Sequence, residues 1–183
     1  MRNALWSGLL LTLSFLSLAA CAGSNPYGYG REYVVRDDEE TYYESALDIS
    51  YEEVRREPQA FESRLLGWFG VVTAVEKLPG GETLVALELR FHQPRHLCTD
   101  QFESSCRVTI SERAGGPFTT TLKLAAVDTK GADRLSPGCL VKIYGAPTGE
   151  FDARGGPVIK AQWYRQWPHG AYVTTSGIAT MRR

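Results

Sequence analysis

The chain has 183 residues, a formal net charge of −1 at pH 7 and 22% charged residues. This length fits one domain of ordinary size with a core of its own. A charge so near zero provides no overall attraction to phosphate backbones. Together with the export signal described next, it leads us to expect no nucleic-acid partner.

The first 20 residues are ordered like a secretory signal. Arg2 gives a positive start, an uncharged run extends from Ala4 to Ala20, and small residues precede Cys21. The end of this run, Leu-Ala-Ala-Cys, resembles a bacterial lipoprotein signal, which implies cleavage after residue 20 and a diacylglycerol on the Cys21 sulfur. A transmembrane anchor is the alternative, but the run is short for a span of about 20 residues.

Residues 21–48 predict a lipidated, flexible tether. Residues 27–30 alternate tyrosine with glycine after Asn25-Pro26, and residues 37–40 form an acidic block. Such a segment buries too little apolar area to offset its ordering entropy. We expect the domain to begin at Ile49, because Ser50 and Glu53 have the spacing of a capping box.

Residues 49–168 predict a mainly β domain that follows two short helical turns. Glycines interrupt the first strand, which indicates a bulge or a sharp coil. A linking segment at 125–135 precedes the last two strands, and residues 169–183 predict a loose C-terminal tail. The pattern favours a small five-element Greek-key OB-like β-barrel, with a β-sandwich as the alternative. The expected strands are 64–77, 83–91, 107–112, 118–124, 139–145 and 157–167.

The remaining cysteines suggest one disulfide. Cys98 and Cys106 lie in a polar segment with loop composition, where an oxidising compartment favours a local bond between them. Cys139 begins an apolar run and is expected to be a buried free thiol.

Metal binding and catalysis are both weakly indicated. His92, His96, Cys98, Asp100 and Cys106 form the nearest approach to a ligand set, but their spacing matches no familiar zinc pattern. The sequence has no Gly-x-Ser-x-Gly elbow and no carboxylate pair placed for glycoside hydrolysis. We therefore expect no metal, no cofactor and no enzymatic activity.

An aromatic and basic cluster, Trp163, Tyr164, Arg165 and Trp167, is the candidate partner or ligand face. A glycan binder would expose these rings as a stacking platform. A structural or scaffold protein would bury the rings and present a patch for another protein.

Several of these segments resemble the Slp-type outer-membrane lipoproteins. They are Gly67-Trp68-Phe69-Gly70-Val71-Val72, the strand 83–91, the run 135–145, and 157–167. The resemblance implies a lipid-anchored protein with a small β-barrel and no established catalysis. In lipoproteins the residue after the cysteine directs sorting, and Ala22 implies the outer membrane because it is not acidic.

The sequence thus predicts an outer-membrane lipoprotein that acts as a structural or protein-interaction module of the cell envelope. Glycan or peptidoglycan binding through the aromatic face is the alternative. The expected partners are membrane lipid, through Cys21, and an envelope protein.

Overall fold

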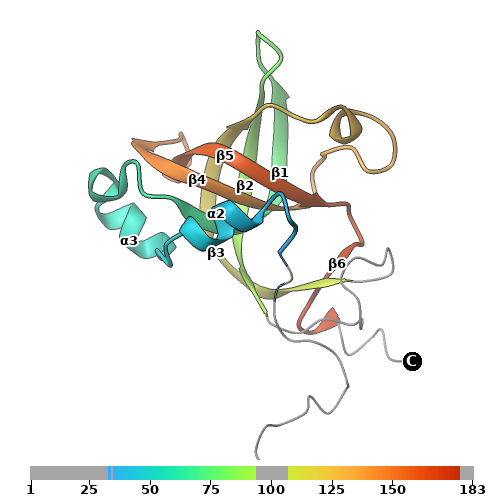
Figure 1. The fold of residues 1–183 in the computed structure, drawn as a ribbon, viewed down its shortest axis with the longest axis horizontal. Coiled ribbons are helices and arrows are strands. Elements are labelled where there is room, and N and C mark those ends of the chain that lie inside the picture. The colour runs from blue at the N-terminus through green and yellow to red at the C-terminus, as the bar shows by residue number, and fades with distance from the viewer. Residues whose placement is uncertain (1–32, 34, 94–106, 178–183) are drawn as a thin grey trace, which may run out of the picture.

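A computed structural model of the chain describes residue 33, residues 35–93 and residues 107–177 (Figure 1). The fold is mainly β, with a few short helices at its periphery. The elements are α2 (Glu40–Ser45), α3 (Tyr51–Arg56), η2 (Pro58–Phe61), β1 (Leu66–Lys77), β2 (Thr83–His92), β3 (Val108–Leu122), η3 (Ala126–Thr129), β4 (Leu140–Phe151), β5 (Pro157–Trp167) and β6 (Tyr172–Thr174).

Strands β1 to β5 close into a barrel. The strand order is β2-β1-β4-β5-β3, and pairing of β2 with β3 closes the ring. All of these pairings are antiparallel except β3 with β5, which is parallel. This five-stranded Greek-key connectivity confirms the predicted OB-fold and excludes the sandwich.

Strand β1 belongs to both halves of the barrel, as its glycines led us to expect. Gly70 pairs with Leu89 of β2 on one edge and with Val141 of β4 on the other. Trp68 and Val72, on either side of Gly70, are buried in the core inside the barrel. The bulge in β1 lies further along, between Val72 and Ala74.

The predicted pair of strands at 107–112 and 118–124 is instead one long strand, β3. The Gly-Gly-Pro segment at 115–117 bends this strand rather than ending it. Gly116 has a φ of 138°, and a Cβ there would lie 2.6 Å from the ring of Tyr51. The Tyr51 hydroxyl donates to the Pro117 carbonyl at 2.9 Å. A side chain at residue 116 would exclude this packing, so glycine is needed here.

The helical turns before the barrel form as predicted. Ser50 caps α3, and its side chain and that of Glu53 complete the capping box. Ile49 and Val54, the residues before Ser50 and after Glu53, are both buried in the barrel core. The indole Nε1 of Trp68 donates to the Ile49 carbonyl at 2.9 Å, which joins this start of the domain to β1.

The predicted tether and tail are both wrong in part. Residue 33 and residues 35–48, here called the strap, lie against the outside of the barrel, with α2 across β4 in Figure 1. Strand β6, within the predicted tail, pairs in parallel with the beginning of β3. Local composition indicated disorder in both segments because their partners lie far away in the sequence. No helix in the described part of the chain is long and apolar enough to cross a membrane.

Candidate partner-binding groove

The four residues of the predicted partner face do not form one surface. Side chains alternate along a strand, so Tyr164 packs on the core inside the barrel. Trp163 lies outside and stacks on Tyr42 of the strap, with ring centres 6.0 Å apart. Arg165 contacts the strap from the same outer side, 3.3 Å from Glu39.

None of the three rings in this cluster is an exposed platform. Trp167 is only 8% exposed and belongs to a second core cluster with Phe69 and Leu140. Trp163 and Tyr164 are half-buried. The predicted face is therefore largely covered, and much of its cover is the chain's own strap.

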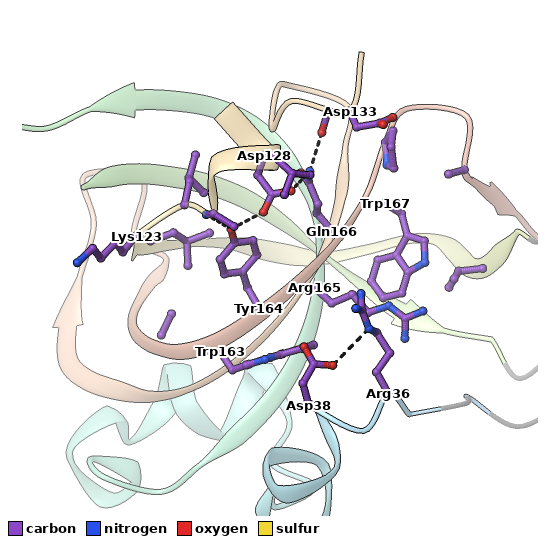
Figure 2. A pocket seen from close by; sticks show the side chains of 18 of the residues that line it. Arg36, Asp38, Lys123, Asp128, Asp133, Trp163, Tyr164, Arg165, Gln166 and Trp167 are labelled. Atoms are coloured by element: carbon purple, nitrogen blue, oxygen red, sulfur yellow. Dashed lines mark hydrogen bonds and ion pairs between the residues drawn. The ribbon is translucent and has the colours of Figure 1, made fainter. Parts of the chain in front are cut away.

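A groove of about 1910 Å³ follows β5 (Figure 2). One side is formed by the second half of β5, and the other by the end of β3 and the start of the β3–β4 connection. The strap contributes residues to the lining as well. The lining residues are Arg36–Asp38, 107–108, 121–125, Val127, Asp128, Asp133 and 161–171.

The groove lies where the barrel is only partly closed. Strand β3 pairs with β5 at Val158, Ile159 and Lys160 alone. Strand β4 continues to pair with the opposite edge of β5 as far as Trp167. Within the described residues, the stretch of β5 from Ala161 to Trp167 thus has a strand on one edge and the groove on the other.

Polar side chains of β5 tie the β3–β4 connection to the floor of the groove. The Tyr164 hydroxyl donates to Asp128 Oδ2 and accepts from the Ala125 amide at 2.9 Å. Burial, helped by the bond to Asp128, raises the pKa of Tyr164 to about 12. Gln166 Nε2 donates to Asp128 Oδ1 and to the Asp133 carbonyl, each at 2.6 Å.

Gln166 also supplies an unsatisfied acceptor. Its Oε1 is buried and has no hydrogen-bond partner among the described residues. A buried polar atom without a partner is costly in a protein interior. Gln166 lines the groove, but because this oxygen is buried, a molecule in the groove reaches it only if the Gln166 side chain moves.

The groove carries charges of both signs, several of them already paired. Arg36 and Asp38 form an ion pair at 3.3 Å. Lys123 extends from the end of β3, and Val127 adds an apolar side chain that is 68% exposed. Such a mixed lining suits a polar, elongated molecule with some apolar side chains better than a polyanion.

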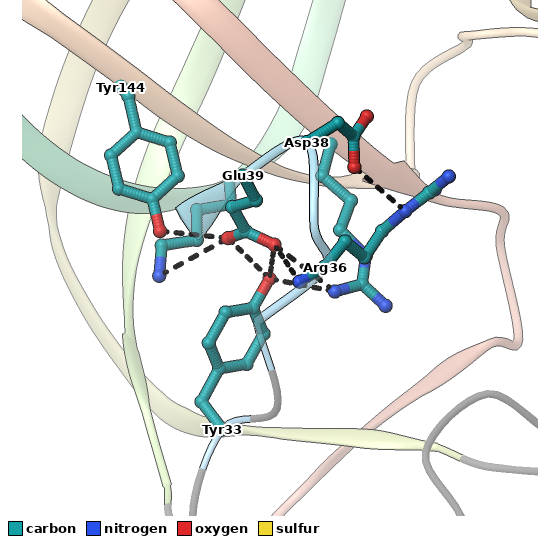
Figure 3. Close-up of polar contacts among 7 residues, drawn as sticks. Tyr33, Arg36, Asp38, Glu39 and Tyr144 are labelled. Atoms are coloured by element: carbon teal, nitrogen blue, oxygen red, sulfur yellow. Dashed lines mark hydrogen bonds and ion pairs between the residues drawn. The ribbon is translucent and has the colours of Figure 1, made fainter. Parts of the chain in front are cut away.

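A buried carboxylate that the sequence analysis missed joins the strap to the barrel (Figure 3). Glu39 is fully buried, with the Tyr144 hydroxyl donating to its Oε1 at 2.8 Å. Lys142 Nζ lies 3.8 Å from Oε1, and Arg165 Nη1 lies 3.3 Å from Oε2. The Tyr33 hydroxyl, from the strap itself, lies 2.8 and 2.9 Å from the two oxygens.

Aromatic rings surround the ammonium group of Lys142. Its Nζ lies 4.0 Å from the ring centre of Tyr33 and 4.7 Å from that of Tyr144. Phe69 and Tyr43 follow at 4.9 and 5.0 Å. Burial lowers the pKa of Lys142 from 10.5 to about 8, although the negative charge of Glu39 opposes the shift.

Several other candidates lie outside the described residues. These are the lipidation site Cys21, the proposed disulfide pair Cys98 and Cys106, and the possible ligands His96 and Asp100. The described part of the chain holds no group of three or more His, Cys, Asp or Glu that could bind a metal. Cys139 is a buried free thiol, as predicted.

Comparison with known proteins adds little. No protein-family model matches the chain, and no curated protein does. Two solved structures of the protein priB from Ralstonia solanacearum are similar to it. One has 14% identity and a TM-score of 0.29 over 56% of this chain and 97% of that protein. The other has 15% identity and a TM-score of 0.29 over 55% and 94%. This likeness is too slight to carry a function.

The exclusion of nucleic acid as a partner is nevertheless withdrawn. The closed five-stranded barrel is an OB-fold, a class that binds oligonucleotides as well as oligosaccharides. Net charge is a sum over the chain and does not describe one groove. Basic side chains such as Lys123 and Arg107 line this one, so the charge argument was wrong as an exclusion.

Proposed function

We propose that this chain is a lipid-anchored protein of the outer membrane whose OB barrel binds an extended segment of a partner protein. The groove along β5 is the binding site, and the role is one of interaction rather than catalysis. The Asp128 carboxylate in the groove accepts hydrogen bonds from Tyr164 and Gln166. It therefore holds the groove in shape, as expected of a residue in a binding surface.

The observation that carries this proposal is the uncovered edge of β5. Extended peptides commonly bind by adding a strand to such an edge, where main-chain hydrogen bonds give affinity. The groove beside residues 161–167 offers the room for such a strand. Val127 offers an apolar contact for a side chain.

Glycan binding is less well supported by the same site. A sugar platform needs an aromatic ring with an open face. Trp167 is buried, Trp163 is stacked on Tyr42, and the Tyr164 hydroxyl is held by Asp128. These contacts favour a protein partner over peptidoglycan.

Site-specific photo-crosslinking in cells tests the groove. A photoreactive residue at Val127, within the groove, should capture a discrete protein, whereas one at Glu76, exposed on β1 and outside the groove, should not. Adding Val127→Asp to a chain with the photoreactive residue at Lys123 should reduce capture several-fold. Equal capture from Val127 and Glu76, or capture of glycan alone, would contradict the proposal.

The anchor needs a separate test. Cys21→Ser should leave the protein unlipidated, either uncleaved or released from membranes. Each methylene buried in the membrane contributes about 0.8 kcal/mol, so one acyl chain anchors a protein only marginally, whereas two or more give lasting attachment. Mass spectrometry of the wild-type N terminus and fractionation of the two membranes are the measurements. An unmodified terminus or a soluble periplasmic protein would disprove the anchor without touching the groove.

A further inference from the structure

The contact between Glu39 and the barrel has the composition of a ligand in its binding site. Three donors that hold the carboxylate, Lys142, Tyr144 and Arg165, belong to β4 and β5. They come from neighbouring barrel strands and would remain together if the strap moved away. The strap supplies the carboxylate and the covering Tyr33 hydroxyl.

Charge makes this part of the barrel selective for an anion. Lys142 and Arg165 place two cationic side chains, 6% and 11% exposed, beside one carboxylate. Buried charges without partners are strongly unfavourable. Without Glu39, the barrel wall would still place the cations of Lys142 and Arg165 side by side with the Tyr144 hydroxyl, which is a site for a carboxylate.

The contacts beside Glu39 define what else such a ligand would carry. Tyr42, three residues later and therefore on the same side of α2, stacks on Trp163 and lies against Tyr144. The neighbouring acids Asp38 and Glu40 remain exposed. The barrel thus recognises one inserted carboxylate and one aromatic ring a helical turn away.

We propose that β4 and β5 form a carboxylate-binding site on the outer wall of the barrel, which the strap occupies in cis through Glu39. Its chemical class of ligand is an acidic peptide segment with an aromatic residue three positions after a glutamate, and such a segment from a partner protein can take the place of the strap. This site adjoins the β5 groove, because Trp163 and Arg165 also line that groove, but it does not depend on the function proposed for the groove.

Chemical rescue tests the site on the full mature chain in detergent. Glu39→Ala should lower the Tm by about 10 °C, because Lys142 and Arg165 lose the buried carboxylate between them. Sodium acetate should recover several degrees of that loss, and sodium chloride at the same ionic strength should not. Glu40→Ala is the matched control, since this neighbour is exposed: it should change the Tm little and show no acetate effect.

A second substitution and a peptide identify the site. Adding Lys142→Met to Glu39→Ala should abolish the acetate effect. A synthetic peptide of residues 36–46 should bind Glu39→Ala and change its tryptophan fluorescence through Trp163. The same peptide with glutamine at position 39 should bind about tenfold more weakly, because a charged hydrogen-bond acceptor is lost.

Each outcome decides the matter. Acetate and chloride acting equally, or equal affinity of the two peptides, would overturn the proposal. If Glu39→Ala does not fold in chloride, refolding in acetate alone would support it. If that variant folds in neither salt, Glu39→Gln takes its place in the peptide measurement. If the photo-crosslinking described above captures no protein but acetate still rescues Glu39→Ala, the function proposed for the groove is refuted and the carboxylate site is supported.

Discussion

The ring of Phe118 lies directly against the backbone of Gly70. A Cβ built on Gly70 would be 2.8 Å from two atoms of that ring and 2.9 Å from the Leu87 Cβ. Gly70 is not among the glycines with positive φ. Glycine is therefore required here because β1 and β3 pack closely across the core, rather than because the backbone needs unusual freedom.

We accordingly expect Gly70→Val to destabilise the domain by about 1–3 kcal/mol or more through overpacking, despite the higher strand propensity of valine. Urea unfolding measures the change. Ala74→Val, on an exposed position of the same strand, is the control and should change the free energy of unfolding by less than about 0.5 kcal/mol.

A further pair of substitutions tests whether the contact with Phe118, rather than any added side chain at residue 70, causes the destabilisation. Gly70→Ala should also destabilise the domain, and Phe118→Leu in the same chain should recover part of the loss because the ring that blocks the Cβ is gone. Purely additive effects of the two substitutions would argue against the contact as the cause.

The Cys98–Cys106 disulfide remains a prediction. Closing so short a loop is worth about 2–3 kcal/mol at most, so Cys98→Ala should loosen the loop and leave the barrel folded. Cys139 is only 1% exposed, and its sulfur lies 3.6 Å from the Ser136 hydroxyl, which suits a free thiol. Peptide mapping under non-reducing conditions that found Cys139 in a bridge would refute the pairing.

The parts of the fold that the sequence predicted correctly depend on residues close together in the chain. The capping box needs only Ser50 and Glu53, and its bonds are present at 3.2 and 2.8 Å. The hairpin of β1 and β2 follows from alternating apolar residues around a glycine turn. Such signals are local, so they can be read without knowing the fold.

The errors arose where a distant residue decides the outcome. Glu39 looked like part of a solvated acidic block, yet Tyr144 and Arg165, which bury it, are 105 and 126 positions away. Gly116 looked like part of a turn because nothing local shows that Tyr51 packs against it. Composition alone points to the aromatic and basic cluster of β5. It does not show that successive side chains of β5 lie on opposite sides of the barrel wall, or that the strap covers the outer ones.

Tyr164 is expected to hold the β3–β4 connection in place. Tyr164→Phe removes the bonds of its hydroxyl to Asp128 and Ala125 while keeping the ring. We expect a loss of about 1–2 kcal/mol in the free energy of unfolding. Amide exchange at Ala125 should become faster, and exchange within β1 should change only in proportion to global stability. Unchanged exchange at Ala125 would mean that the connection is held by other contacts.

The pH dependence of stability tests the buried Lys142. Its folded-state pKa of about 8 lies below the 10.5 of the ordinary side chain, so the unfolded chain binds more protons between these values. The contribution of Lys142 to the free energy of unfolding therefore increases with pH across this interval. Burial raises the pKa of Tyr33 and Tyr144, so above about pH 10 the unfolded tyrosines ionise first and stability falls.

The free energy of unfolding should thus increase from about pH 7 to about pH 9.5 and decrease beyond about pH 10. Lys142→Met removes the titrating ammonium and leaves Glu39 paired with Arg165 at 3.3 Å. It should flatten the rise and keep the later fall, whereas Lys160→Met, exposed on β5, should alter neither. Urea unfolding at closely spaced pH values gives the curves. A rise that survives Lys142→Met would show that another group titrates in this range.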